Sequence, residues 1–268
     1  MLMYEKFFDM LHTPFTNSIP TSSLYLSDSV REGLGRLCYT AENQLFAVVT
    51  ATVGCGKTTL IRRLKDSLDP EKYVVLYLSD SQLTPRWFYN GLLQQLGAEP
   101  KFYRGDAKLS LHQQLEYIRQ AKHRNVITIV DEAHLLKRET LEEIRFMLNY
   151  QMDSMNPMAL VLVGQNELWD KLNLQSYAAV RQRIDLKCEL PAFDRAQTEA
   201  YIQAHLAYAK GAIDIFTDKA MDEIYTYSTG AARAINKVCM HALLSAAQHN
   251  KKLIDDHMVH LVIESELP

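Results

Sequence analysis

The sequence predicts an α/β fold in which a parallel-sheet sandwich core is followed by an all-helical lid domain. Short apolar segments alternate with helical patterns as far as residue 190, and only helical patterns follow Pro191. Such alternation is typical of a parallel sheet covered by helices on both faces. The chain has 268 residues, of which 47% are apolar, and is long enough to bury a substantial core. We therefore expect an N-terminal arm over residues 1–26, an α/β core over 27–190 and a helical lid over 191–268.

Apolar runs of strand length are the basis for the predicted sheet. They predict strands at 44–50, 73–78, 126–130, 159–163 and 184–190. Apolar residues at helical spacing predict intervening helices at 27–41, 58–68, 84–98, 108–122, 138–150 and 173–183. Ser27 can cap the first helix, and Thr84 followed by Pro85 is a favourable helix start. The arm is expected to be irregular, and the lid patterns predict helices at 194–210, 217–228, 231–249 and 254–264.

The charge and the cysteine content exclude several classes of protein. The chain has 29 Lys and Arg against 32 Asp and Glu, a net charge of −3, which excludes a polycation. Its four cysteines form no CxxC pair, so neither a zinc ribbon nor a disulfide scaffold is expected. The first residues lack a signal-peptide cleavage site, and no apolar run approaches the roughly 20 residues of a membrane span. We expect a cytoplasmic protein with no membrane segment.

A phosphate-binding loop is predicted between the first strand and the helix after it. Residues 51–58 fit the P-loop pattern G-x-x-x-x-G-K-[ST], except that Ala51 replaces the first glycine. If this position required a positive φ, alanine would cost about 1 kcal/mol or more. Lys57 is expected to contact the β- and γ-phosphates of ATP, and the Thr58 hydroxyl to bind Mg²⁺. The other predicted nucleotide-binding residues are Thr52, Val53, Gly54, Cys55, Gly56 and Thr59.

An acidic pair after the third predicted strand completes the site. The apolar run 126–130 is followed by Asp131 and Glu132, which is the Walker B pattern. Asp131 is expected to hold Mg²⁺ directly or through water, and Glu132 to orient or deprotonate the attacking water. His134 has no partner at metal-ligand spacing, so we expect a helix-start or packing residue rather than a metal ligand. The P-loop and the acidic pair together predict binding and hydrolysis of Mg·ATP.

Motifs along nearly the whole chain resemble those of one family. In order, they are Pro14-Phe15, Leu24-Tyr25-Leu26, ATVGCGKTT, VDEAHLL, LVGQNEL, RQRI and TGAARAINKVC. The chain is similar to ExeA-type AAA+ ATPases and to the accessory ATPases of DDE transposases, of the TniB/TnsC type. The resemblance implies a P-loop NTPase core of the ASCE class and a helical lid. It also implies a ring or helical homo-oligomer, hexamer-like in size, with ATP sites at the interfaces between subunits.

The resemblance assigns roles to residues outside the two motifs. Gln165, with Asn166 as the alternative, matches the polar residue after the fourth strand that senses the γ-phosphate. Arg183, with Arg181 as the alternative, matches the arginine finger that acts on the ATP of the neighbouring subunit. Arg233, in a G-x-x-R pattern of the lid, resembles the sensor 2 arginine that contacts the nucleotide. The alternatives are a polar pair in a loop for Gln165 and Asn166, and a solvated or intradomain ion pair for Arg181 and Arg183. For Arg233 the alternative is a charge at a helix start.

The length of the chain separates two roles within this family. Secretion ATPases of the ExeA type carry a membrane span and a peptidoglycan-binding part after the ATPase module, and this sequence contains neither. We therefore expect a transposition regulator that selects targets for a DDE transposase and oligomerises with ATP on DNA. The alternative is a secretion or envelope-assembly ATPase that works through a membrane protein partner. A third possibility is a scaffold that is switched by ATP without hydrolysing it.

A locally basic segment indicates where double-stranded DNA would bind. Residues 101–124 hold six basic and two acidic side chains, although the whole chain is slightly acidic. Contacts between these side chains and phosphates would be non-specific and salt-dependent, and an oligomer would repeat them in every subunit. An ordinary solvated pair of helices is the alternative. The predicted DNA-binding residues are Lys101, Arg104, Lys108, Arg119, Lys122 and Arg124.

Overall fold

The computed structural model describes residues 3–80, 83–148 and 156–267, which form two compact units. The sheet unit contains Ser29–Ala51 and Lys57–Leu190. The helical unit contains the residues up to Asp28, the short segment Thr52–Gly56 and the residues from Pro191 onward. Each unit has its own hydrophobic core. Most of the P-loop therefore packs with the helical unit, although the strand before it and the helix after it belong to the sheet unit.

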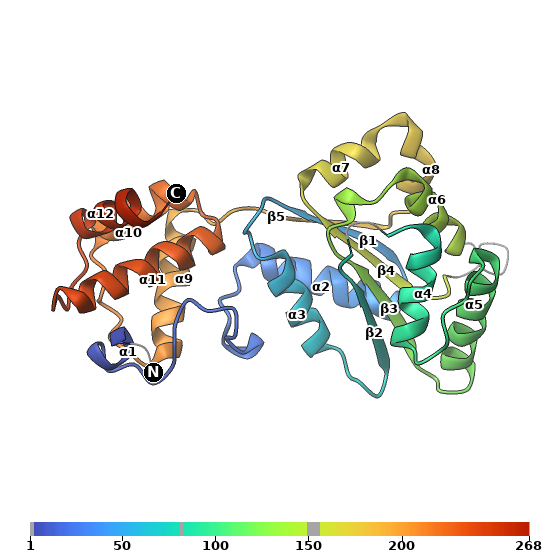
Figure 1. Cartoon of the computed structure of the whole chain (residues 1–268), viewed down its shortest axis with the longest axis horizontal. Helices are drawn as coiled ribbons and strands as arrows, with labels where there is room; N and C mark the ends of the chain where they lie inside the picture. Colours follow the sequence, from blue (N-terminus) through green and yellow to red (C-terminus); the bar gives the residue numbers. More distant parts are fainter. Residues whose placement is uncertain (1–2, 81–82, 149–155, 268) are drawn as a thin grey trace. The chain divides into compact units, whose positions relative to one another are not determined.

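Five parallel strands form the sheet, in the order β2-β3-β4-β1-β5 (Figure 1). They are β1 (Phe46–Ala51), β2 (Tyr73–Leu78), β3 (Asn125–Val130), β4 (Ala159–Gly164) and β5 (Leu186–Leu190). Val48 of β1 lies opposite Leu162 of β4, and Val161 of β4 lies opposite Ile129 of β3. The predicted strands are confirmed to within two residues. Because β4 separates β1 from β3, the two strands that precede the predicted phosphate-binding motifs are not neighbours.

Helices cover both faces of this sheet (Figure 1). One face carries α2 (Asp28–Asn43) and α3 (Lys57–Ser67), and the other carries α4 (Pro85–Gln95), α5 (Arg104–Gln120) and α6 (Arg138–Met147). The predicted start of α4 is confirmed, since the Thr84 hydroxyl accepts a hydrogen bond from the Trp87 N–H and Pro85 opens the helix. The predicted end of α6 at residues 149–150 lies outside the described residues.

The segment between β4 and β5 differs from the prediction. An unexpected helix, α7 (Asn166–Asn173), begins directly after β4. The helix expected at 173–183 is instead a 3₁₀ turn over Gln175–Tyr177 followed by the single turn α8 (Ala178–Arg181). Leu168 and Leu172 are fully buried and place α7 against the core. With only Leu168, Trp169 and Leu172 apolar, this octapeptide is too short to reveal the helix from sequence periodicity.

The helical unit consists mainly of α9 (Arg195–Ala209), α10 (Asp218–Ser228), α11 (Ala232–Gln248) and α12 (Asp256–Glu266). These helices confirm the predicted ones to within two residues. Asp194 and Gln197 form a capping box at the start of α9, in which each side chain bonds the other residue's backbone N–H. Among the described residues, no helix is both long enough and apolar enough to cross a membrane.

The N-terminal arm is more ordered than expected. It contains the short helix α1 (Met3–Phe7), which packs on α11, and Tyr4 and Met10 are fully buried. The Phe15 ring stacks on His205 of α9 with 5.1 Å between ring centroids, and the Phe15 N–H donates to His205 Nδ1. The arm is therefore part of the hydrophobic core of the helical unit rather than an irregular extension.

Candidate active site

The carboxyl edge of the sheet brings the predicted phosphate-binding residues of the sheet unit together. In a parallel sheet all carboxyl ends meet at one edge, and the residues that follow β1, β4 and β3 succeed one another along it. Lys57 opens the helix that follows the β1 loop, Gln165 follows β4, and Asp131 follows β3. Gln165 therefore extends from the strand that lies between the two motif strands.

The departure at Ala51 carries no backbone strain. Ala51 is the last residue of β1, is buried and pairs with Leu190 of β5. Its φ is not positive, whereas Gly54 and Gly56 have φ of 81° and 86°. The conformations that favour glycine thus fall on the two glycines that the sequence retains. The cost that we expected for alanine at position 51 does not arise.

Lys57 and Thr58 begin α3 directly after the loop. The Lys57 side chain is 9% exposed, and its Nζ donates a 3.0 Å hydrogen bond to the carbonyl oxygen of Ala51. Its ammonium group is therefore held along the loop, where a phosphate group would lie. Thr58 is exposed at the first turn of α3, and Thr59 is half-buried. Thr52 and Val53 are exposed, whereas Cys55 is buried.

Asp131 is oriented by a residue that the sequence analysis did not identify. The Tyr77 hydroxyl donates a 2.7 Å hydrogen bond to Asp131 Oδ2, and the Glu132 N–H donates to Asp131 Oδ1. The Asp131 residue is 5% exposed. Burial, followed by the hydrogen bond to Asp131, raises the pKa of Tyr77, so its phenol remains a donor near neutral pH. The only sequence signal for this contact was that β2 carries tyrosine hydroxyl groups among otherwise apolar side chains.

Glu132 has an unusual backbone conformation, with φ of 52° in the left-handed region. Such strain in a non-glycine residue is concentrated at functional sites. Glu132 Oε2 lies 3.6 Å from His134 Nδ1, and the same nitrogen accepts a long 3.5 Å hydrogen bond from the Gln165 N–H. His134 therefore connects the acidic pair to the loop after β4.

The residues at this edge fit Mg²⁺ only when a nucleotide shares the coordination. Within the described part of the chain, no group of three or more His, Cys, Asp or Glu side chains could hold a metal. Asp131 and Thr58 supply one carboxylate and one hydroxyl, which are the hard oxygen ligands that Mg²⁺ prefers. Mg²⁺ is usually held by one or two carboxylates together with phosphates and waters. These two oxygen donors therefore fit Mg²⁺ that is bound together with a nucleotide.

Replacing Tyr77 with Phe should weaken the response to Mg²⁺ about 10- to 100-fold, since ligand-orienting hydrogen bonds commonly contribute that much to metal affinity. Titrating Mg²⁺ into the ATPase assay measures the effect. Tyr73→Phe is the matched control, because Tyr73 points to the same face of β2 but lies at its other end. Equal Mg²⁺ dependence of Tyr77→Phe and wild type would show that Asp131 needs no such support.

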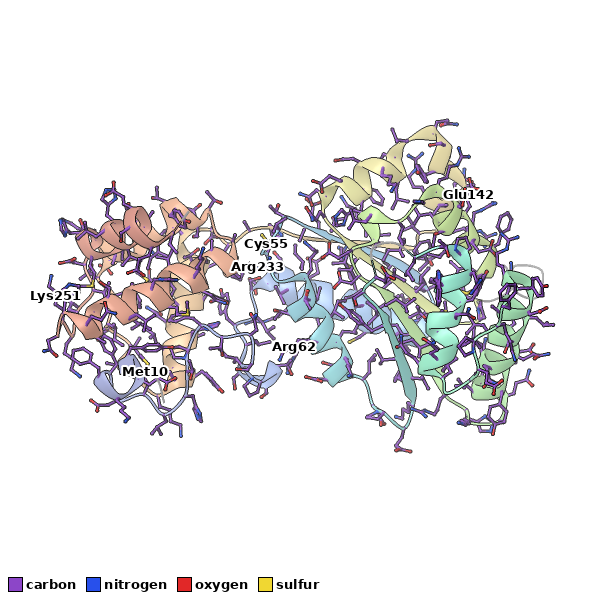
Figure 2. The ribbon with its side chains drawn as sticks, in the orientation of Figure 1. Met10, Cys55, Arg62, Glu142, Arg233 and Lys251 are labelled. Carbon is purple, nitrogen blue, oxygen red and sulfur yellow. The ribbon has the colours of Figure 1, made fainter. Side chains whose placement is uncertain are left out.

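Within the helical unit, the start of α11 contacts the P-loop segment Thr52–Gly56. The backbone N–H of Arg233 donates a 3.1 Å hydrogen bond to the Gly54 carbonyl, and a Cβ placed on Gly54 would lie 3.1 Å from Arg233 Cβ. Figure 2 shows Arg233 and Cys55 close together at this point. Arg233 is itself exposed. Its predicted nucleotide contact stays a prediction, but its backbone is bonded to the loop that would bind the phosphates.

The two candidate arginine fingers have different surroundings. Arg181 Nη1 donates a 2.9 Å hydrogen bond to the Asn173 carbonyl within the same unit. Arg183 follows α8 and lines a hollow before β5, at the amino edge of the sheet. The roles predicted for both arginines remain predictions.

The basic segment 101–124 does not present six equivalent cations. Arg104 and Lys108, near the start of α5, both pair with Glu143 of α6, at 3.3 and 3.2 Å. At the other end, Arg119 donates to the Asn156 carbonyl, and Arg124 donates to the carbonyls of Pro70 and Tyr73. Lys122 lies over the Tyr117 ring, and Lys101 is half-buried. Binding of DNA by this segment stays a prediction, now with two separate cationic ends rather than one continuous patch.

The fold is that of P-loop ATPases of the AAA+ type. Residues 40–172 match the family model described as an AAA domain. The chain is also 30% identical over 260 residues to General secretion pathway protein A of Aeromonas hydrophila. That match covers 94% of this chain and 46% of the relative, so the chain spans about half the relative's length. These matches support an ExeA-like AAA ATPase, whereas similarity to TniB and TnsC stays a prediction.

Solved structures of low sequence identity share the fold. The Aeropyrum pernix ORC2 protein, in ADPNP and ADP complexes, has a TM-score of 0.65 at 15% identity and covers 97% of this chain and 71% of its own. Drosophila ORC bound to DNA has a TM-score of 0.69 at 16% identity, with coverage of 98% and 65%. Thermotoga maritima RuvB has a TM-score of 0.58 at 16% identity, with coverage of 89% and 68%.

Proposed function

We propose that copies of the chain assemble and hydrolyse Mg·ATP at the interfaces between them. The position of Arg183 carries the proposal. Arg183 lies at the amino edge of the sheet, whereas Lys57 and Asp131 lie at the carboxyl edge. A six-residue strand separates the two edges by roughly 20 Å, which is more than an arginine side chain spans. Arg183 therefore cannot reach the phosphate site of its own copy and would act on that of a second copy.

Each residue at the carboxyl edge has a defined task in this proposal. Lys57 and the N–H groups of the P-loop hold the β- and γ-phosphates. Thr58 and Asp131 would hold Mg²⁺, which neutralises phosphate charge when bound. Glu132 orients or deprotonates the attacking water, and Gln165 contacts the γ-phosphate from between the motif strands.

Replacing Arg183 with Ala should lower turnover about 1,000-fold, as expected for an arginine finger, while ATP affinity stays nearly unchanged. Phosphate release and the binding of a fluorescent ATP analogue measure the two quantities. Arg138→Ala is a control, because Arg138 is exposed and pairs with Glu142 on α6. Loss of turnover in Arg181→Ala but not in Arg183→Ala would contradict the assignment.

We further propose that assembly takes place on double-stranded DNA and regulates a DDE transposase. Arg104 and Lys108 share the Glu143 carboxylate, and Asp106 lies between them, so the cationic excess at this end of α5 comes from Lys101. Phe102 and Tyr103 are exposed beside it. Lys122 adds an exposed cation at the other end of the helix. Phosphate contacts of this kind give binding that is independent of sequence and weakens with salt.

Anisotropy of a labelled DNA duplex, with a slowly hydrolysed ATP analogue, tests the DNA proposal. Lys101→Glu combined with Lys122→Glu should weaken binding at least tenfold and flatten its salt dependence. Lys251→Glu is the control, because Lys251 is exposed in the helical unit (Figure 2) and is far from residues 101–124 in the sequence. No binding by the wild type at low salt would exclude the proposal.

A second candidate function has its own support. The curated relative is named for the general secretion pathway, which favours a secretion or envelope-assembly ATPase that works through a membrane protein partner. Co-purification with membrane proteins, in place of DNA binding, would favour this role over transposition. Both candidates use the same ATP site, so the Arg183 experiment applies to either.

A further inference from the structure

A polar hollow of about 520 Å³ lies at the amino edge of the sheet. Several of the residues that line it come shortly before the strands or at their first position. Gln44 and Leu45 precede β1, Asn125 opens β3, Asn156 precedes β4 and Asp185 precedes β5. The hollow therefore lies at the sheet edge opposite Lys57. A nucleotide bound at Lys57 of the same copy of the chain would not reach it.

Two arginines from separate elements line this hollow. Arg119 belongs to the last turn of α5, and Arg183 follows α8. From the sequence, Arg119 was expected to bind DNA and Arg183 to act on the ATP of a neighbouring subunit, yet both residues line the same hollow in the structure. Arg119 is half-buried, and its Nη1 makes a long 3.4 Å hydrogen bond to the Asn156 carbonyl. Such a weak contact leaves a guanidinium able to bond a stronger acceptor.

Two carboxylates oppose these cations. Glu42 of α2 and Asp185 line the same hollow, and Asp185 Oδ2 already accepts a 2.8 Å hydrogen bond from the Phe46 N–H. The formal charge of the hollow is balanced, so it needs no permanently bound counter-ion. Paired guanidinium groups match the oxygens of phosphate better than ammonium groups do. The hollow thus suits a phosphate group that arrives and leaves.

We infer that this hollow receives the γ-phosphate of ATP bound to a second copy, and that Arg119 contacts it beside Arg183. The inference rests on the proposed assembly and adds a second arginine to the shared site. Two guanidinium groups spread over the equatorial oxygens stabilise charge that develops during phosphoryl transfer. Arg119 therefore acts on turnover more than on ATP affinity.

Mixing variants tests the inference. Arg119→Ala lowers kcat about 10- to 100-fold and changes KM less than threefold. Lys57→Ala is inactive, because it holds no ATP, but it still offers both arginines to a neighbour. Mixed in equal amounts, the two variants form some interfaces in which an intact phosphate site meets intact arginines. Activity should therefore rise several-fold above the sum of the separate variants.

Matched variants keep each outcome decisive. Lys72→Ala removes an exposed cation that precedes β2 at the same edge of the sheet but lies outside the hollow, and it leaves the rate unchanged. Arg119→Gln retains more of the side chain and should be rescued in the same way if Arg119→Ala folds poorly. A loss of rate without rescue makes Arg119 a structural residue of its own copy and overturns the inference, as does an unchanged rate. Rescue of Arg183→Ala but not of Arg119→Ala overturns only this inference, whereas an inactive wild type overturns the proposed function.

Discussion

Replacing Glu132 with Gln should lower the turnover number about 100- to 10,000-fold, because the amide cannot accept a proton from the attacking water. ATP binding should remain close to wild type, since Lys57 and the P-loop hold the phosphates. The side chain keeps its shape, and the positive φ of Glu132 stays the same in both proteins. Single-turnover phosphate release measures the rate, and a fluorescent ATP analogue measures affinity.

Glu139→Gln is the matched control for this substitution, because Glu139 is exposed in the first turn of α6 and makes the same change of charge. It should hydrolyse ATP at the wild-type rate. If the Glu132 variant turned over as fast as this control, the base would have to be another group, and the strained backbone at Glu132 would need another explanation. Trapping of the variant in its ATP-bound state should also stabilise assembly, which light scattering can follow.

Local sequence signals were sufficient for the framework of the site. Strands such as β2 and β4 are short runs of β-branched and other apolar residues, and their bounds follow from that composition alone. The P-loop and the acidic pair are each contiguous, so the backbone that follows one strand fixes their geometry. Ala51 was the exception, because its conformation depends on whether β1 ends before or after it.

Contacts that depend on register or on packing could not be predicted in this way. Tyr77 meets Asp131 only because β2 and β3 pair with Leu78 opposite Val130. Arg119 and Arg183 are far apart in the sequence and share a hollow only because α5 and α8 both end at the amino edge of the sheet. The net charge of residues 101–124 likewise does not show that Glu143, which lies outside this segment, pairs with both Arg104 and Lys108.

Gly230 lies where the helical unit turns from α10 toward the helix that contacts the P-loop. Its φ is 79°, and a Cβ at this position would lie 1.9 Å from the Phe193 carbonyl oxygen. The other close atoms are also backbone atoms of Phe193, at 2.7 and 2.8 Å. The Phe193 N–H donates a 3.0 Å hydrogen bond to the Gly230 carbonyl, which holds the two segments together. No rotation of a side chain can make room for a methyl group here.

Gly230→Ala should therefore destabilise the helical unit by about 3–5 kcal/mol, through both backbone strain and forced movement of the segment at Phe193. Gly97→Ala is the matched control, because Gly97 has a φ of 76° but no atom within 4 Å of an added Cβ, so only about 1 kcal/mol of strain is expected.

Trp87 and Trp169 both lie in the sheet unit, so tryptophan fluorescence follows that unit while circular dichroism follows all helices. In urea, the Gly230 variant should show an early dichroism transition with little early change in fluorescence. Equal transitions for the two glycine variants would mean that the Phe193 segment moves freely, and that α11 needs no fixed turn to hold Arg233 on the P-loop.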